Sequence, residues 1–500
     1  MARAAVLLGL AVVVCYANTL AAPFLFDDPL PGTRLHFQTR QLVWGSFALN
    51  RALSGAETWS YHVFNALVHL ASGLLLLGAL RRALSLARPR ASNAGLALAV
   101  TLLWLVHPLQ TSTVTYLSQR AEALATLGYL GTVYGFLRAL DAPAPRRWQA
   151  FALASLAFGF LAKETIATAP LFLLLAELAL VPGALRANLR RRWRFHLVVW
   201  LAALNLAWLA IAPKLLAEES SSGFGPHASF GPLDYLRTQP GVLLHYLRLS
   251  FWPHPQVFDY GWPVARTLGA WLPQALVLAA LAALAFFLLA RRSALGLALA
   301  AFFVVLLPSS SIVPIKDLAF EHRMYLPLAP VLLLTALAVE QAAARIRPRG
   351  PQILTLCSAL AVLALGAASV RRNHDYRSAS ALWRTVVEHA PDNARAHNNL
   401  ASALLDEEHL GEARIDQAER VLARALELDP NSSFVHRNLA RVAAWRGQIG
   451  PAIGHLERSL ALKDSPAARR DMALLLDLTG RAAEGEVHRA RALELERAQD

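Results

Sequence analysis

Long apolar stretches alternate with short polar connections over most of the chain. A helix needs about twenty apolar residues to span the hydrocarbon core of a bilayer, and somewhat fewer when it ends in the interface. The pattern therefore predicts an all-α, polytopic membrane domain in residues 1–370. We count about eleven spans, at residues 4–22, 62–80, 93–106, 122–139, 149–162, 166–181, 196–212, 271–290, 294–308, 327–344 and 352–370.

Arginine is concentrated in alternate connections of this predicted bundle, which read RRALSLARPR, APAPRRW, RANLRRRWR, ARRS and RIRPRG. Short cytoplasmic loops carry an excess of Lys and Arg, so these five connections are predicted to face the cytoplasm. The N-terminus then lies inside and the end of the chain outside, in a periplasm or lumen. Because arginine supplies nearly all the positive charge, as in GC-rich bacteria, we expect a bacterial inner-membrane protein.

The chain becomes soluble and helical in character after residue 371. AHNNLASALL aligns with VHRNLARVAA at an offset of about 39 residues, and RNLARVA aligns with RDMALLL at about 33. These offsets bracket the 34-residue tetratricopeptide (TPR) period. We therefore predict about three TPR-type helical hairpins in residues 371–500, on the periplasmic or lumenal side. Stacked hairpins form a groove that can bind a protein or peptide, although a plain helical bundle is the alternative.

The composition agrees with a membrane protein, with 56% hydrophobic and 16% charged residues. The net charge of +14 would suggest nucleic-acid binding in a soluble chain. Here the basic residues stand in short clusters between spans, so nucleic acid is not an expected partner. Cys15 and Cys357 lie in apolar stretches and indicate no disulfide framework. No Gly-rich phosphate loop, zinc spacing or nucleophile elbow is present, and we expect no metal and no cofactor.

Two adjacent acids, Asp27 and Asp28, follow the first span in the segment FLFDDPLPG. Asp-Pro is typical of a simple turn with hydrated side chains. An apolar wall, however, disfavours the ionised form of a carboxylate and raises its basicity. Either acid is therefore a candidate general base for an acceptor hydroxyl. The residues alone do not decide between the two.

Three further charged residues lie in the next two outer connections. Arg120, in HPLQTSTVTYLSQRAE, is a candidate for bidentate phosphate binding, with a salt bridge to Glu122 or another acid as the alternative. Lys163 and Glu164 interrupt the apolar segment LAKETIATAP. Ionisable residues between spans usually serve a site or pair with one another. We expect Lys163 to bind an anionic ligand and Glu164 to orient the ligand or the acceptor, unless the two form a turn at the interface.

The densest polar cluster stands before the tenth predicted span, in PSSSIVPIKDLAFEHRMYLP. Glu321, His322 and Arg323 supply an acid, a titratable group and a permanent cation at the membrane surface. His322 and Arg323 are suitable donors for phosphate oxygens, and Glu321 is a candidate for orienting the substrate. A collar of interfacial charge is the alternative. Together these loops predict a site for a lipid-anchored phosphate at the outer leaflet.

The ordered set of motifs resembles a known family. FLFDDP, HPLQTSTVTYLSQRAE, LAKETIATAPLFLL, FWPHPQVFDYGWP and EHRMYLP, followed by TPRs, are similar to the transmembrane and TPR-containing O-mannosyltransferases and their bacterial relatives, which are GT-C glycosyltransferases. The resemblance covers almost the whole chain, although the repeat array is short. It implies transfer of a sugar from a polyprenyl-phosphate carrier to an acceptor hydroxyl, with protein Ser/Thr as the expected acceptor.

The resemblance also assigns residues. It implies a catalytic acid in the first outer loop, which maps onto Asp27 or Asp28. It carries over Lys163, Glu164, Glu321, His322 and Arg323 as site candidates. Two other function classes remain open at this stage. A membrane-anchored TPR scaffold would recruit envelope proteins without chemistry, and a transporter would be expected to show charge near the midplane of the membrane.

Overall fold

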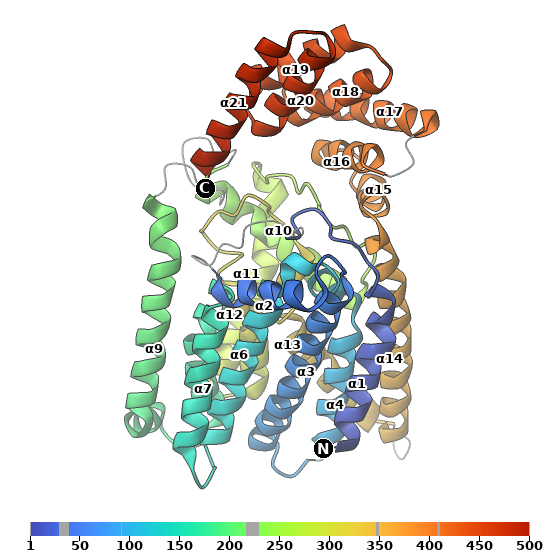
Figure 1. Ribbon diagram of the computed structural model, residues 1–500. Coiled ribbons are helices and arrows are strands. Elements are labelled where there is room, and N and C mark those ends of the chain that lie inside the picture. Colours follow the sequence, from blue (N-terminus) through green and yellow to red (C-terminus); the bar gives the residue numbers. More distant parts are fainter. Residues whose placement is uncertain are drawn as a thin grey trace. The chain divides into compact units, whose positions relative to one another are not determined.

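The computed structural model describes residues 2–29, 40–91, 93–216, 230–346, 350–407 and 411–499 (Figure 1). Two compact units form. Unit 1 comprises Met1–Gln256 and Trp262–Arg377, and unit 2 comprises Val257–Gly261 and Ser378–Asp500. The domain border predicted at 370/371 falls a few residues before the border between the units. Parts of two predicted outer connections, residues 30–39 and 217–229, lie outside the described residues.

The regular secondary structure of unit 1 is all helical in its described residues. Its α-helices are α1 (Ala2–Tyr16), α2 (Gln41–Ser54), α3 (Trp59–Ala87), α4 (Ala94–Val106), α5 (Thr111–Val114), α6 (Arg120–Ala139), α7 (Pro145–Phe160), α8 (Ala169–Leu180), α9 (Leu185–Leu216), α10 (Pro232–Phe251), α11 (Leu268–Ala290), α12 (Ala294–Leu306), α13 (Leu328–Ala344) and α14 (Gly350–Asn373). Short 3-10 helices η1 (Ala17–Thr19), η2 (Pro108–Gln110), η3 (Leu117–Gln119), η4 (Glu164–Thr168), η5 (Glu321–Met324) and η6 (His374–Arg377) join them.

The predicted count of eleven spans is not confirmed. Four helices among the described residues are long and apolar enough to cross a membrane, at Ala2–Thr19, Trp59–Ala87, Leu268–Ala290 and Gln352–Arg377. A fifth candidate is the bent pair Ala94–Val106 and Pro108–Val114. Each of the other apolar stretches is occupied by a helix, but those helices are shorter, more polar or only partly described. Helix formation was therefore predicted more reliably than complete crossing.

Close packing of α6 on α7 fixes the position of the first turn of α6. A side chain at Gly128 would bring its Cβ within 2.7 Å of the Gly159 Cα atom, and one at Gly135 within 2.9 Å of the Trp148 carbonyl oxygen. Only glycine permits this approach, as is common where helices pack in membranes. The backbone contact therefore holds the N-terminal end of α6 at a defined place in unit 1.

A polar stripe on α3 faces the interior of unit 1. Asn65, His69 and Ser72 are spaced by four and three residues, which places them on one helix face, and all three are fully buried. His69 Nδ1 lies 2.7 Å from Tyr325 Oη, and the indole nitrogen of Trp104 donates to the Tyr325 carbonyl oxygen at 2.7 Å. These contacts attach the segment after η5 to α3 and α4.

Unit 2 consists of helical hairpins. Helix α15 (Ala379–His389) precedes the paired helices α16 (Ala394–Leu405) and α17 (Glu412–Leu428), α18 (Ser433–Trp445) and α19 (Ile449–Leu462), and α20 (Pro466–Leu478) and α21 (Ala482–Gln499). The pairs match the three TPR-type repeats expected from the sequence, with α15 as the closing helix of a partial repeat.

A short segment from the connection after α10 belongs to unit 2 rather than to unit 1. The Asp259 carboxylate accepts two hydrogen bonds from the Arg395 guanidinium, at 2.6 and 2.7 Å. Asn393 Nδ2 donates to the Asp259 carbonyl oxygen, and the Phe258 and Trp383 rings form an edge contact. The FWPHPQVFDYGWP motif therefore supplies part of the packing of the repeat unit.

Candidate active site

The first three predicted outer connections meet at the start of α6 (Arg120–Ala139). Ser118, directly before this helix, donates from its backbone nitrogen and from Oγ to Asp28 Oδ1, at 2.6 and 2.9 Å. In the first turn of α6, Glu122 Oε2 lies 2.8 Å from Lys163 Nζ. The N-terminal end of α6 therefore joins the acids of the first loop to the lysine of the third.

Asp28 is a buried carboxylate that shapes the first loop. Its side chain accepts the two hydrogen bonds from Ser118, and its second oxygen accepts one from the Leu25 backbone nitrogen at 2.9 Å. Burial raises the pKa of Asp28 to about 7, while these hydrogen bonds and the charge of Arg120 act in the opposite direction. Because both oxygens are engaged within the protein, Asp28 is poorly placed to receive a proton from a substrate.

Asp27 differs from Asp28 in its exposure to solvent. Its backbone nitrogen donates to Tyr116 Oη at 3.2 Å, and its carbonyl oxygen accepts a hydrogen bond from Ser118 Oγ at 2.7 Å. The residue itself is exposed. The main chain is thus held on both sides of a carboxylate that a substrate can reach.

Arg120 is fully buried and its guanidinium is surrounded by protein acceptors. Nε donates to Asn65 Oδ1 at 2.7 Å, Nη1 to Asn50 Oδ1 at 2.6 Å and to Ser46 Oγ at 3.1 Å, and Nη2 to the Tyr61 carbonyl oxygen at 3.0 Å. The alternative expected from the sequence was a salt bridge to Glu122 or another acid, and no such ion pair of Arg120 is found among the described residues. Neutral groups of α2 and α3 accept its hydrogen bonds instead. This arrangement connects both helices to the first turn of α6.

Lys163 and Glu164 do not pair with each other. The Lys163 side chain, 16% exposed, is paired with Glu122, and Glu164 Oε2 lies 3.8 Å from an Arg40 side-chain nitrogen. Arg40, at the start of α2, was not singled out from the sequence. The only signal available was its position on an outer connection, where arginine is scarce.

His322 lies in the electrostatic neighbourhood of three cations. Burial lowers the pKa of His322 well below its ordinary value, and the charges of Lys163, Arg323 and Arg40 lower the pKa further. The imidazole ring stacks on Phe320 with ring centroids 5.0 Å apart. His322 is therefore neutral at neutral pH, and it can offer one N–H to an anion but no fixed positive charge.

Arg323 is buried and holds the connection before η5 in shape. Nη2 donates to the Asp317 carbonyl oxygen at 2.6 Å, and Nη1 donates to the carbonyl oxygens of Leu318 and Ser309, at 3.0 and 3.4 Å. Main-chain carbonyls in irregular loops need such donors when they are removed from water. The geometry is that of a residue that organises the loop.

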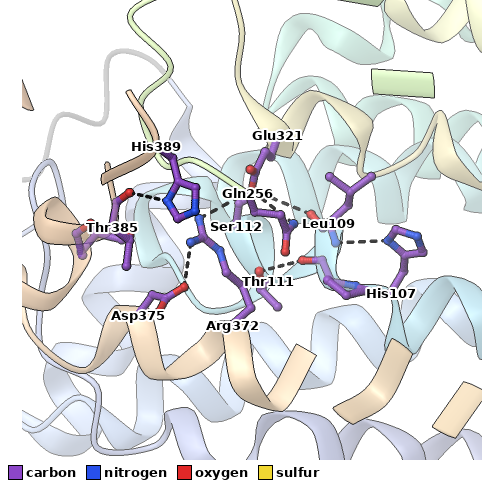
Figure 2. Close-up of polar contacts among 12 residues, drawn as sticks. His107, Leu109, Thr111, Ser112, Gln256, Glu321, Arg372, Asp375, Thr385 and His389 are labelled. Carbon is purple, nitrogen blue, oxygen red and sulfur yellow. Dashed lines mark hydrogen bonds and ion pairs between the residues drawn. The ribbon is translucent and has the colours of Figure 1, made fainter. Parts of the chain in front are cut away.

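Glu321 belongs to a buried polar network that joins η5 to the end of α14 (Figure 2). Its carboxylate accepts a hydrogen bond from Gln256 Nε2 at 3.4 Å and lies 3.8 Å from Arg372 Nη2. Arg372 Nη1 in turn donates to Asp375 Oδ2 at 2.8 Å. Glu321 is 2% exposed, so its contacts are with the protein.

The predicted site residues therefore form two groups. Asp28, Arg120, Glu321 and Arg323 are buried, with side chains bonded to other parts of unit 1. Asp27, Lys163, Glu164 and His322 are the more accessible group, which Arg40 joins. Within the described ranges, no cluster of three or more His, Cys, Asp or Glu side chains has the arrangement of a metal site.

Curated relatives align with the chain over both short and long ranges. Protein O-mannosyl-transferase Tmtc2 of Drosophila melanogaster is 29% identical over 189 residues, which is 31% of this chain and 19% of that protein. Protein O-mannosyl-transferase TMTC1 of Homo sapiens is 24% identical over 517 residues, which is 88% of this chain and 56% of that protein. The chain is thus similar in sequence to the TMTC O-mannosyltransferases. It spans about half the length of the human protein. No protein-family model matches it.

Two solved structures are also similar to this chain. ArnT from Cupriavidus metallidurans, solved with undecaprenyl phosphate, covers 94% of this chain and 79% of its own, with 18% identity and a TM-score of 0.41. A thermophilic TPR protein of Thermus thermophilus covers 31% of this chain and 91% of its own, with 25% identity and a TM-score of 0.22. Both TM-scores are low, so the relationship rests on the aligned sequences. The long apolar helices among the described residues indicate an integral membrane protein.

Proposed function

We propose that this protein is an integral-membrane glycosyltransferase that moves a sugar from a polyprenyl-phosphate donor to an acceptor hydroxyl on the extracytoplasmic side. The names of its relatives favour mannose as the sugar and protein as the acceptor. The observation that carries the proposal is the convergence at the start of α6. Tyr116 and Ser118, just before the helix, bind the main chain of the exposed Asp27, and Glu122 in the first turn pairs with Lys163.

Asp27 is the proposed general base. As the acceptor oxygen attacks C1 of the sugar, its proton passes to the Asp27 carboxylate. The bond between C1 and the phosphate oxygen breaks, and its electron pair stays with the leaving lipid phosphate. Asp28 acts by holding the turn through Ser118 and Leu25, which keeps the neighbouring carboxylate in place. The choice of Asp27 over Asp28 is supported by exposure, since Asp27 is exposed and Asp28 is buried.

Lys163, Arg40 and the N–H of His322 are the proposed phosphate ligands. Negative charge accumulates on the phosphate as it leaves, and a positioned donor in such a site stabilises the transition state by roughly 3 kcal/mol. Glu164 orients Arg40 through their ion pair. Arg120 and Arg323, predicted as phosphate ligands, are reassigned to positioning roles because their donors are satisfied by Asn, Ser and carbonyl oxygens of the protein.

Unit 2 is proposed to bind the acceptor polypeptide. Asn399 and Asn438 occupy equivalent positions in successive repeats, two residues before Ala401 and Ala440. The side-chain nitrogen of Asn399 is buried and has no hydrogen-bond partner among the described residues. An amide nitrogen of this kind is suited to a peptide carbonyl oxygen.

The test is sugar transfer by the full chain reconstituted in vesicles, with radiolabelled polyprenyl-phosphate mannose as the first donor and envelope protein as the acceptor. We expect labelled protein with the unaltered chain and with Glu57→Gln, which removes an exposed acid of the same outer region. Asp27→Asn should transfer sugar about a thousandfold more slowly. Binding of envelope proteins without transfer from any polyprenyl-phosphate sugar would instead favour the scaffold function.

A further inference from the structure

A cavity apart from the acids of the first loop lies between α8 (Ala169–Leu180) and α9 (Leu185–Leu216). Its volume is about 660 Å³. The lining residues combine apolar, aromatic and basic side chains: Leu174, Leu185, Arg186, Leu189, Arg190, Trp193, His196 and Trp200. Apart from Leu174 they recur every three or four residues along α9, so one face of that helix forms most of the wall.

A buried ion pair makes this wall rigid. Glu177 of α8 is fully buried, and its two carboxylate oxygens accept hydrogen bonds from Arg192 Nε at 3.0 and 3.1 Å. Arg192 has non-helical backbone angles, with φ −116° and ψ 19°, so α9 bends at this residue. The cavity is therefore framed by a fixed contact between two helices and is more than a gap between mobile side chains.

Two arginines at the cavity lack partners. Arg186 and Arg190 are exposed and stand one helical turn apart, and neither forms a hydrogen bond or ion pair within the described part of the chain. By contrast, Arg192 of the same helix forms an ion pair with Glu177. An anion bound at this cavity would meet two guanidinium groups on the same helix face.

His196 provides an independent indication of a ligand. It is 6% exposed and lines the cavity, and its Nε2 lies 3.3 Å from Glu177 Oε2. A contact with a carboxylate oxygen requires a proton on Nε2. Nδ1 is buried without a hydrogen-bond partner among the described residues. A hydroxyl from a bound molecule would satisfy it.

We propose that this cavity binds an anionic phospholipid of the surrounding bilayer, with the phosphate on Arg186 and Arg190 and an acyl chain against Leu174, Leu189 and Trp200. Basic pockets between membrane helices are suited to anionic lipid headgroups, and Trp prefers the headgroup level. A glycerol headgroup would also supply the hydroxyl for His196 Nδ1. The arginine cluster that sets topology thus has a second role as a lipid site, which is independent of the proposed sugar transfer.

The test is native mass spectrometry of the full-length protein in detergent, titrated with phosphatidylglycerol or phosphatidylcholine. Each basic residue near an anionic surface contributes about 1 kcal/mol, so Arg190→Gln should weaken phosphatidylglycerol binding about fivefold and Arg186→Gln/Arg190→Gln about 30-fold. Arg191→Gln is the matched control, because this adjacent exposed arginine does not line the cavity. Its binding should equal that of the unaltered protein.

Three results would overturn the proposal. The first is equal affinity of the unaltered protein for the two lipids, which needs no variant. The second is an equal loss of binding in Arg190→Gln and Arg191→Gln, which would show diffuse attraction to a basic helix. The third is saturation of the same site by inorganic phosphate at the lipid's concentration, which would remove the role of the acyl chain.

Discussion

Lys163 Nζ lies 2.8 Å from Glu122 Oε2, with side chains that are only 16% and 8% exposed. This ion pair joins the start of η4 to the first turn of α6. A charged side chain that is removed from water needs an oppositely charged partner. Without one, the free-energy cost of desolvation exceeds any stabilisation that the single charge gains from the protein. The pair therefore has a structural role beside the proposed phosphate contact, and the two roles can be separated.

Replacement of Lys163 by Gln should destabilise the protein and also weaken donor binding. Glu122 would be left buried without its cation, at a cost of about 3 kcal/mol. The melting temperature in detergent and the KM for the polyprenyl-phosphate donor measure the two effects.

A double variant, Lys163→Gln/Glu122→Gln, separates them. Two neutral amides can hydrogen-bond to each other, so the melting temperature should recover while the donor KM stays high. Recovery of both quantities would show that Lys163 only neutralises Glu122 and does not contact the phosphate.

Replacement of Arg120 by Lys should act on stability. An ammonium group cannot reproduce the contacts with Asn65, Asn50 and the Tyr61 carbonyl oxygen, and the loss of buried partners costs about 3 kcal/mol. The protein that remains folded should bind the donor with an unchanged KM. Arg40→Lys is the comparison, since it should alter the KM with little effect on melting. The reverse pattern would restore Arg120 as a phosphate ligand.

The pH dependence of unfolding tests the environment of Asp28. Burial raises its pKa from 3.8 to about 7 in the folded protein. Between these values the folded state holds a proton that the unfolded state has released, so the contribution of Asp28 to stability is greatest below about pH 4 and decreases as the pH rises towards 7. This group contributes on the order of 4 kcal/mol to the change. Asp28→Asn should lose that part of the pH dependence in urea unfolding, and an unchanged slope would show that Asp28 titrates normally.

The helical elements could be predicted well because their signal is local. Apolar runs mark each predicted span, and the TPR-type repeats were visible as offsets close to 34 residues. The number of crossings could not be predicted, because stretches such as 294–308 and 327–344 are apolar and form helices but fall short of a full span. The length of an apolar stretch in the sequence does not by itself distinguish a helix that crosses the membrane from a shorter one.

The candidate site was predicted from loops that were expected to share one side of the membrane, and the first three of these loops meet at the start of α6. The roles of individual side chains were harder to predict, because they depend on interaction partners that are far apart in the sequence. Arg120 is bonded to Asn50 and Asn65, which no charge pattern marks. Arg40 could not be identified from the sequence, because only the fold brings it close enough to His322 to affect the pKa of the imidazole. The difference between Asp27 and Asp28 likewise depends on Ser118, about ninety residues away.

In the proposed mechanism Asp27 accepts the proton of the acceptor hydroxyl while Asp28 holds the loop. The decisive measurement is single-turnover sugar transfer by Asp27→Asn, with the donor bound at saturation. We expect a melting temperature close to that of the unaltered protein and a rate about a thousandfold lower, because a general base is lost. A rate within a few-fold of the unaltered protein, together with intact donor binding, would contradict it.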